Sequence, residues 1–332
     1  MTICAKENTG ISVLMVTFNS AELLHESAGS LIGQPGIETI IVDNSSFDDT
    51  VQVVKTKYPQ AQIICNSVNV GFGKAVNQAA KIATGRTIVL VNPDSVVSVE
   101  VLRALDAEVH RGNCRIAGPA IRQPSGRLSI HSAGKFPTLR AVMFHYFGLS
   151  RFARWVPPLQ GHYLIPRKSE SRVLKTDWVT GAVLAVNAAS WAEVGGMNER
   201  WFMYAEDIDL CWKMRNRGYD VHLMTQLKAL HHVGSSDVTA SRNYKADWIV
   251  NLLDFYRIRY EPSTANSIVW CEVVAMGLYG RAMAYAMLSK FSKGKRKDMW
   301  EEESVKFRFY AKSIVIEAYK LLTTPTRTLW HR

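Results

Sequence analysis

Three short apolar runs separated by helical segments constrain the fold of this 332-residue chain more than any other feature. The runs cover residues 11–18, 38–42 and 86–91. Their length and β-branched content are typical of buried parallel strands. The helical segments between them cover residues 21–31, 49–57 and 73–84, and a weaker strand is expected at 62–65. This alternation predicts an α/β fold with a mostly parallel, nucleotide-binding sheet flanked by helices.

Polar side chains follow each apolar run directly. They are Thr17, Asn19, Asp43, Asn44, Asn92 and Asp94. Ligands of parallel sheets bind beyond the carboxyl ends of the strands, so we expect these residues on one rim. Asp43 there can hydrogen-bond a nucleoside, and Asp94 beside a diphosphate can ligate Mg²⁺ or Mn²⁺. A simple Pro-Asp turn is the alternative for Asp94.

A glycine-rich turn opens the helix predicted at 73–84. Gly71 lets the backbone approach a ligand closely, while Lys74 and Asn77 lie at the start of the helix, where free N–H groups favour anions. The GxxxxGK[ST] pattern of a P-loop is absent, so turn formation alone also explains the glycine.

Three carboxylates lie among large apolar side chains in residues 201–212. They are Glu206, Asp207 and Asp209. Burial beside aromatic surface and repulsion between acids both raise a carboxyl pKa, which tunes a general base. Capping of a helix that starts nearby is the alternative function of these acids.

Composition indicates a globular protein, since 47% of residues are hydrophobic, and the formal charge of +11 suggests anionic partners. Phosphates, anionic lipid and nucleic acid all fit such a charge. Residues 290–332 hold eleven Lys or Arg against five Asp or Glu, so the excess is concentrated there. The five cysteines are scattered, and no apolar leader precedes residue 11; we therefore expect reduced thiols and a cytoplasmic catalytic part.

Residues 268–288 form an apolar stretch that Glu272 and Arg281 interrupt. Each charge would cost roughly 2.5–3.5 kcal/mol near a bilayer centre, which disfavours a plain spanning helix. An interfacial or re-entrant helix beside the basic cluster at 293–297 fits better. A buried helix that packs on the domain or forms a dimer contact is the alternative.

Six blocks together resemble the inverting nucleotide-sugar glycosyltransferases of the GT-A fold, glycosyltransferase family 2, and particularly their bacterial rhamnosyltransferase-like branch. The blocks are residues 16–19, 42–46, 69–73, 92–94, 178–182, and 195–198 continuing through 206–210. The match runs from residue 12 to about residue 236. It implies a catalytic domain at 1–255 and a helical, basic, membrane-associating region at 256–332.

The resemblance also assigns roles to residues. The donor-binding residues would be Thr17, Asn19, Asp43, Asn44, Gly71, Lys74, Asn77 and Asn92. The acceptor-binding residues would be Trp178, Gly181, Ala182 and Glu206. Asp94 and His232 would hold Mg²⁺ or Mn²⁺, with His231 as the competing register because adjacent histidines on a strand face opposite ways. Asn92 replaces the first acid of the family's DxD motif.

By the same resemblance Asp207 would be the general base and Glu206 would orient the acceptor. The implied donor is dTDP-L-rhamnose, with galactofuranosyl or other hexosyl donors as alternatives. The implied acceptor is a polyprenyl-diphosphate-linked sugar of O-antigen or related glycans, at the cytoplasmic face of the bacterial inner membrane. A nucleic-acid-binding protein is the competing class, but the chain has no recognisable nucleic-acid module. The oligomeric state stays open.

Overall fold

The computed structural model describes residues 10–126, 128–153, 155–164, 173–232 and 244–323. These form two compact units. The first unit combines Met1–Gly134 with Pro166–Thr239, and the second combines Lys135–Ile165 with Ala240–Arg332. The domain boundary expected after residue 255 falls within helix α8 (Asp247–Tyr260) and stays a prediction.

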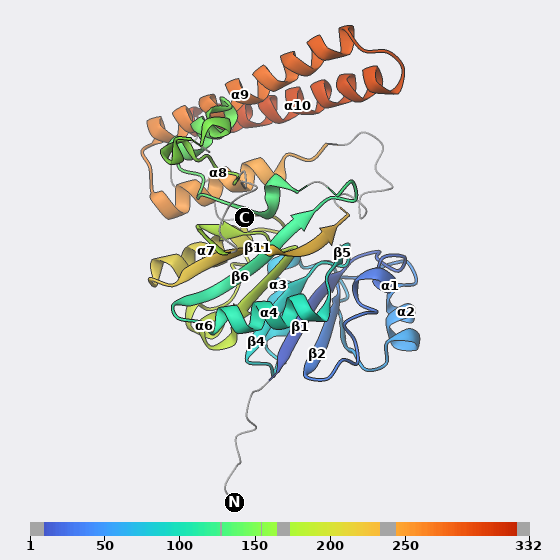
Figure 1. The fold of residues 1–332 in the computed structure, drawn as a ribbon. Helices are drawn as coiled ribbons and strands as arrows, with labels where there is room; N and C mark the ends of the chain where they lie inside the picture. Colours follow the sequence, from blue (N-terminus) through green and yellow to red (C-terminus); the bar gives the residue numbers. More distant parts are fainter. Residues whose placement is uncertain (1–9, 127, 154, 165–172, 233–243, 324–332) are drawn as a thin grey trace, which may run out of the picture. The chain divides into compact units, whose positions relative to one another are not determined.

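A nine-stranded sheet forms the centre of the first unit (Figure 1). Its strand order is β3-β2-β1-β4-β10-β6-β11-β5, and β8 pairs with β11. The strands are β1 (Ile11–Thr17), β2 (Ile37–Asp43), β3 (Gln62–Cys65), β4 (Thr87–Val91), β5 (Ser95–Val96), β6 (Cys114–Arg122), β8 (Val173–Thr176), β10 (Val183–Asn187) and β11 (Asp220–His231). Strands β3, β2, β1 and β4 are parallel, as predicted, so their carboxyl ends share one edge. The antiparallel β10 makes the sheet mixed.

Helices flank this sheet, which confirms the predicted fold class. They are α1 (Leu24–Ser27), α2 (Thr50–Lys57), α3 (Phe72–Ala80), α4 (Val99–Val109), α6 (Ala188–Val194) and α7 (Glu206–Asn216). Fully buried side chains such as Val13, Ile41 and Leu105 fill the core, which explains the apolar runs. The helix expected at 21–31 is only the four-residue α1, because Gly29 weakens a helix and Gly33 takes a φ of 77°.

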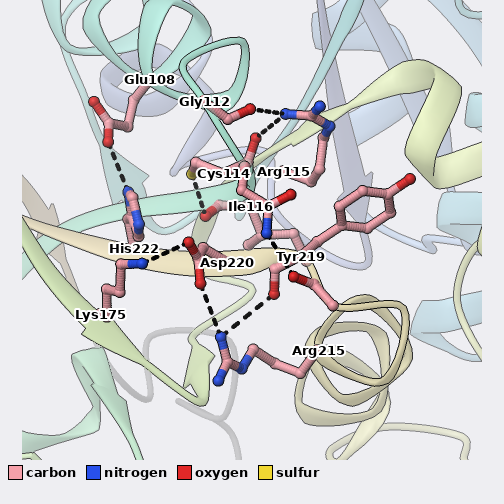
Figure 2. A network of polar contacts seen from close by, with 12 residues as sticks. Glu108, Gly112, Cys114, Arg115, Ile116, Lys175, Arg215, Tyr219, Asp220 and His222 are labelled. Carbon is pink, nitrogen blue, oxygen red and sulfur yellow. Dashed lines mark hydrogen bonds and ion pairs between the residues drawn. The ribbon is translucent and has the colours of Figure 1, made fainter.

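Polar contacts tie the amino-terminal end of β11 to α4, α7 and β8, at the edge opposite the carboxyl ends of β1, β2 and β4 (Figure 2). Asp220 accepts hydrogen bonds from Lys175 at 2.7 Å and from Arg215 at 3.1 Å. His222 Nδ1 lies 2.7 Å from Glu108 Oε1. These contacts join α4, α7, β8 and β11, and therefore stabilise this half of the sheet.

Glu108, Cys114 and His222 offer three ligand atoms within 4.8 Å of one another. Burial raises the pKa of the Cys114 thiol to about 12, so the thiol is protonated at neutral pH. The basic side chains of Lys175 and Arg215 pair with the neighbouring Asp220. The contact between Glu108 and His222 within this cluster links α4 to β11.

The second unit is helical. It contains α5 (Leu139–Tyr146), α8, α9 (Thr264–Lys290) and α10 (Lys295–Thr323), and α9 and α10 pack along each other as a hairpin (Figure 1). Trp270 on α9 is fully buried and donates a hydrogen bond to the Pro137 carbonyl at 2.8 Å. In the part of the chain that the structure describes, no helix combines the length and apolarity that crossing a membrane requires.

Candidate active site

The carboxyl ends of β1 and β2 place a buried carboxylate at the rim of the sheet. Asp43 is 2% exposed, and its oxygens accept hydrogen bonds from the Thr17 hydroxyl at 3.1 Å and from the Ser46 amide at 2.9 Å. The backbone N–H of Asn19 donates a hydrogen bond to the Ser46 hydroxyl at 2.8 Å, and Asn19 has a φ of 50°. The predicted residues Thr17, Asn19 and Asp43 thus meet at one point.

A second link runs from this rim to the glycine turn. Asn44 donates its side-chain amide to the Gly71 carbonyl at 3.2 Å. Gly71 has a φ of 86°, and a Cβ there would lie 2.7 Å from the Phe202 carbonyl. Phe72 donates its amide to that same carbonyl at 2.8 Å. The glycine turn therefore holds the loop that leads into the acidic segment.

Helix α3 carries two further residues predicted to bind the donor. Lys74 is exposed. Asn77 donates to the Met197 carbonyl and to Glu199 Oε1, both at 2.9 Å, and accepts from the Met197 amide at 3.0 Å. Since both ends of the Asn77 amide hold the Met197 loop, a contact with the donor would require these bonds to be replaced.

The turn after β4 presents the carboxylate predicted to bind a metal. Asp94 is 9% exposed, and His231 Nε2 lies 3.0 Å from Asp94 Oδ1. His232 donates its backbone amide to the Asp94 carbonyl at 2.9 Å, but its ring nitrogen Nε2 lies 3.8 Å from Glu26 Oε2. The geometry thus favours His231, the alternative metal ligand, over His232. The assignment of His232 as a ligand stays a prediction. Residues 233–236, which complete its motif, lie outside the described residues.

The acids predicted to be catalytic lie at the start of α7. Tyr204 and Ala205 precede them with φ values of 72° and 76°, a strained turn that such residues rarely adopt. Asp207 Oδ2 accepts the Gly181 amide at 2.8 Å, and Oδ1 accepts the Ile208 amide at 2.8 Å. The turn and the two amides fix the direction of this carboxylate.

Burial sets the charge of the acidic pair. Burial first, and the neighbouring charge of Asp207 second, raise the pKa of Glu206 to about 8. Burial also raises the pKa of Asp207, while the Gly181 and Ile208 amides favour its ionised form. The two backbone amides therefore make Asp207, rather than Glu206, the more readily ionised member of the pair. Asp209 is fully buried 3.9 Å from Lys213 Nζ, in keeping with a structural function.

The block predicted to bind the acceptor connects the two carboxylate turns. The Gly181 backbone N–H donates to Asp207, and the carbonyl of the adjacent Ala182 accepts a hydrogen bond from the Asn92 backbone N–H at 2.9 Å. Trp178 is 3% exposed in β9 (Trp178–Val179), which pairs with β7 (Ala133–Gly134). Two consecutive residues therefore bring the predicted base next to the turn that carries the predicted metal ligand.

Comparison with known proteins shows what this arrangement is similar to. Residues 12–163 match the model of glycosyl transferase family 2. The N-acetylglucosaminyl-diphospho-decaprenol L-rhamnosyltransferase of Mycobacterium tuberculosis is 28% identical over 244 residues, which are 68% of this chain and 77% of that protein. Over these residues the chain resembles glycosyl transferase family 2. It is a glycosyltransferase, as the six blocks predicted.

Two further relatives of this glycosyltransferase bear on its fold and chemistry. The low-salt glycan biosynthesis hexosyltransferase Agl10 of Haloferax volcanii is 22% identical over 226 residues, 67% of each protein. The structure of the mannosyltransferase PcManGT from Pyrobaculum calidifontis, in complex with GDP-Man and Mn²⁺, superposes with a TM-score of 0.57 at 14% identity. That match covers 96% of this chain and 88% of the other, and it confirms the GT-A fold.

Two residues at the rim of the sheet, Ser46 and Phe47, were given no role from the sequence of the glycosyltransferase. Ser46 binds both Asp43 and Asn19, and no periodic signal separates it from an ordinary turn serine. Phe47 is 85% exposed and meets the Phe18 ring edge to face at 6.1 Å between centroids. An aromatic residue in an otherwise polar turn was the available signal.

Replacing Glu206 by glutamine should stabilise the protein at alkaline pH. An unfolded glutamate ionises near pH 4.3, whereas folded Glu206 keeps its proton up to a pH of about 8, so the folded state loses relative stability as pH rises through this window. We expect E206Q to raise the free energy of unfolding by about 1–3 kcal/mol at pH 8.5, and the gain to disappear below about pH 5. Urea unfolding from pH 5 to 9 measures this difference.

The exposed Glu272 on α9 offers a matched control, because E272Q removes an acid that is not buried. Its stability difference should not vary with pH in this way. A gain in E206Q that is the same at every pH would contradict the raised pKa of Glu206.

Proposed function

We propose that this glycosyltransferase transfers L-rhamnose from dTDP-L-rhamnose, with inversion, onto a polyprenyl-diphosphate-linked sugar. The observation that carries the proposal is the Gly181–Ala182 backbone, which holds Asp207 beside the Asn92–Asp94 turn. The Mycobacterium tuberculosis relative, whose name states a lipid-diphosphate acceptor and L-rhamnose, supports the choice of both substrates. Agl10 favours a hexosyl donor as the second candidate.

The donor would bind along the rim made by β1, β2 and the glycine turn. Asp43 and Thr17 would contact the nucleoside, and the exposed ring of Phe47 stands next to Phe18 at the same rim. Lys74 and the amide groups at the start of α3 would face the diphosphate, because a helix amino terminus attracts anions. Asn92 would lie between donor and acceptor sites.

Asp207 would take the proton from the acceptor hydroxyl as that oxygen attacks the anomeric carbon from the face opposite the nucleoside diphosphate. One displacement inverts the configuration and needs no covalent enzyme intermediate. Glu206, protonated at neutral pH, would donate a hydrogen bond that orients the acceptor, together with Trp178 and the Gly181–Ala182 backbone. The bonds to Gly181 and Ile208 keep Asp207 aimed in one direction throughout.

A divalent cation fits the residues at the β4 turn. A carboxylate and an imidazole nitrogen 3.0 Å apart, at Asp94 and His231, match the oxygen and nitrogen ligands that Mn²⁺ accepts, and Mg²⁺ is the alternative. The PcManGT complex contains Mn²⁺, which supports this assignment. When bound, the cation would neutralise charge on the departing diphosphate.

The proposed acceptor is anchored in a bilayer by its polyprenyl chain. The protein would therefore work at the cytoplasmic face of the bacterial inner membrane, in the synthesis of O-antigen or a related surface polysaccharide. The second unit, with its basic residues at 290–297, supplies the charge that such a surface attracts.

Product analysis with a panel of nucleotide sugars tests the proposed donor and acceptor. Purified protein is incubated with Mn²⁺, a lipid-diphosphate GlcNAc acceptor, and dTDP-L-rhamnose, UDP-galactofuranose or UDP-glucose in separate reactions. We expect the acceptor to gain the mass of one deoxyhexose residue, about 146 Da, only in the reaction with dTDP-L-rhamnose. Addition of a hexose instead would replace the rhamnosyl assignment with the second candidate.

Replacing Asp207 by asparagine should reduce turnover by a factor of about 10²–10⁴, because the amide cannot accept the acceptor proton. Donor binding should change little, since Asp207 faces the acceptor in this proposal. Initial rates and calorimetric titration with the nucleotide separate the two effects. Asp247→Asn, at an exposed acid of α8, is the control, and equal rates for D207N and the parent would exclude Asp207 as the base.

Removing divalent ions with EDTA should abolish transfer, and Mn²⁺ should restore it. Asp94→Asn should raise the Mn²⁺ concentration for half-maximal activity by about tenfold or more. His231→Ala and His232→Ala form a matched pair, of which the first should show the larger shift because His231 lies 3.0 Å from Asp94. A larger shift in H232A would instead support the register predicted from the sequence.

A further inference from the structure

Helix α9 has two apolar faces with different surroundings. Trp270, Val274, Leu278 and Ala282 are completely buried within the second unit. An opposite set of large apolar side chains is exposed. It comprises Val269 (41%), Met276 (55%), Met283 (69%) and Met287 (63%). These positions are seven, seven and four residues apart and therefore form one stripe along the helix.

Basic side chains gather where this stripe ends, at the turn between α9 and α10. They are Lys290, Lys293, Lys295, Arg296 and Lys297, and all are exposed. Phe291 is 81% exposed within the same turn. Only Lys297 forms an ion pair with a described residue, Glu301 at 3.6 Å. We call the exposed Met283, Met287, Leu288 and Phe291 together with the five basic residues the hairpin tip.

We propose that the hairpin tip docks on the anionic surface of a lipid bilayer. The inference rests on the proposed function, because it names the surface at which the lipid-linked acceptor would be met. Apolar side chains flanked by lysine and arginine are the combination that inserts shallowly among headgroups while the cations contact lipid phosphates. The tip has no acidic residue between Glu272 and Asp298, so nothing in it repels these phosphates.

Charge also distinguishes lipid from a second copy of the chain. A symmetric contact between two tips would bring ten cations together, whereas an anionic bilayer neutralises them. Each basic residue near such a surface contributes about fivefold to affinity. Several together with the apolar stripe suffice for reversible docking of an otherwise aqueous protein.

Sedimentation of the full chain with vesicles tests this surface. The test vesicles are phosphatidylcholine with about 30% phosphatidylglycerol. We expect the affinity for these vesicles to exceed the affinity for pure phosphatidylcholine vesicles by about tenfold or more. The quadruple variant K293Q/K295Q/R296Q/K297Q should lose at least about tenfold of that binding. The variant M283S/M287S/F291S should also bind more weakly, although its charge is unchanged.

The matched control removes four exposed basic residues from the first unit, K55Q/K57Q/K81Q/R103Q. It should bind vesicles nearly as well as the parent. Equal loss in the control and the tip variant would show that net charge alone drives binding and would overturn the proposal. So would failure of the parent to bind, or a dimer in light scattering that M283S/M287S/F291S abolishes without any change in vesicle binding.

Transfer to a water-soluble acceptor with a short lipid chain separates this inference from the proposed function. The quadruple tip variant should retain full activity on that acceptor while it loses activity on the vesicle-bound one. Vesicle binding as expected, with no transfer by the parent from any donor, would leave the docking surface standing and refute the function. Transfer on both acceptors without tip-dependent binding would refute the docking surface alone.

Discussion

The hydrogen bond from the Gly181 amide to Asp207 is the contact on which the arrangement of the active site depends. The carbonyl of the next residue, Ala182, accepts a hydrogen bond from the Asn92 backbone N–H and so fixes the turn that carries Asp94. A backbone segment of two residues thus links Asp207 to the Asn92–Asp94 turn. A side chain at position 181 would approach the Cβ of Asp207 to 3.3 Å, so glycine keeps this contact short.

The same contact explains why strain and burial occur together at the start of α7. Positive φ values at Tyr204 and Ala205 each cost of the order of 1 kcal/mol, and a buried carboxyl pair costs more. The bond from Phe72 to the Phe202 carbonyl and the bonds of Asn77 to Met197 offset part of this by holding the loop on both sides. Stability elsewhere in the fold therefore permits two adjacent buried acids after a strained turn.

Local patterns predicted the donor half of the fold because its strands are short, apolar and parallel. Asp43 and Asp94 follow those strands directly, so their positions on the rim could be inferred from strand direction alone. In the other half of the sheet, β6 was missed. The strand β6 contains Gly118 and Pro119, which resemble loop residues, and its partners in β11 lie about one hundred residues further along the chain. Only tertiary pairing identifies such a strand.

Side-chain contacts show the same limit within the site and beyond it. Nothing local distinguishes His231 from His232, because adjacent strand residues differ only in the face they present. The contact of His231 with Asp94 appears only in the folded structure. Likewise the apolar content of α9 does not reveal that Trp270 is buried while Met283 is exposed. The distribution of burial around that helix, and not its composition, separates a packing surface from a surface that is available to lipid.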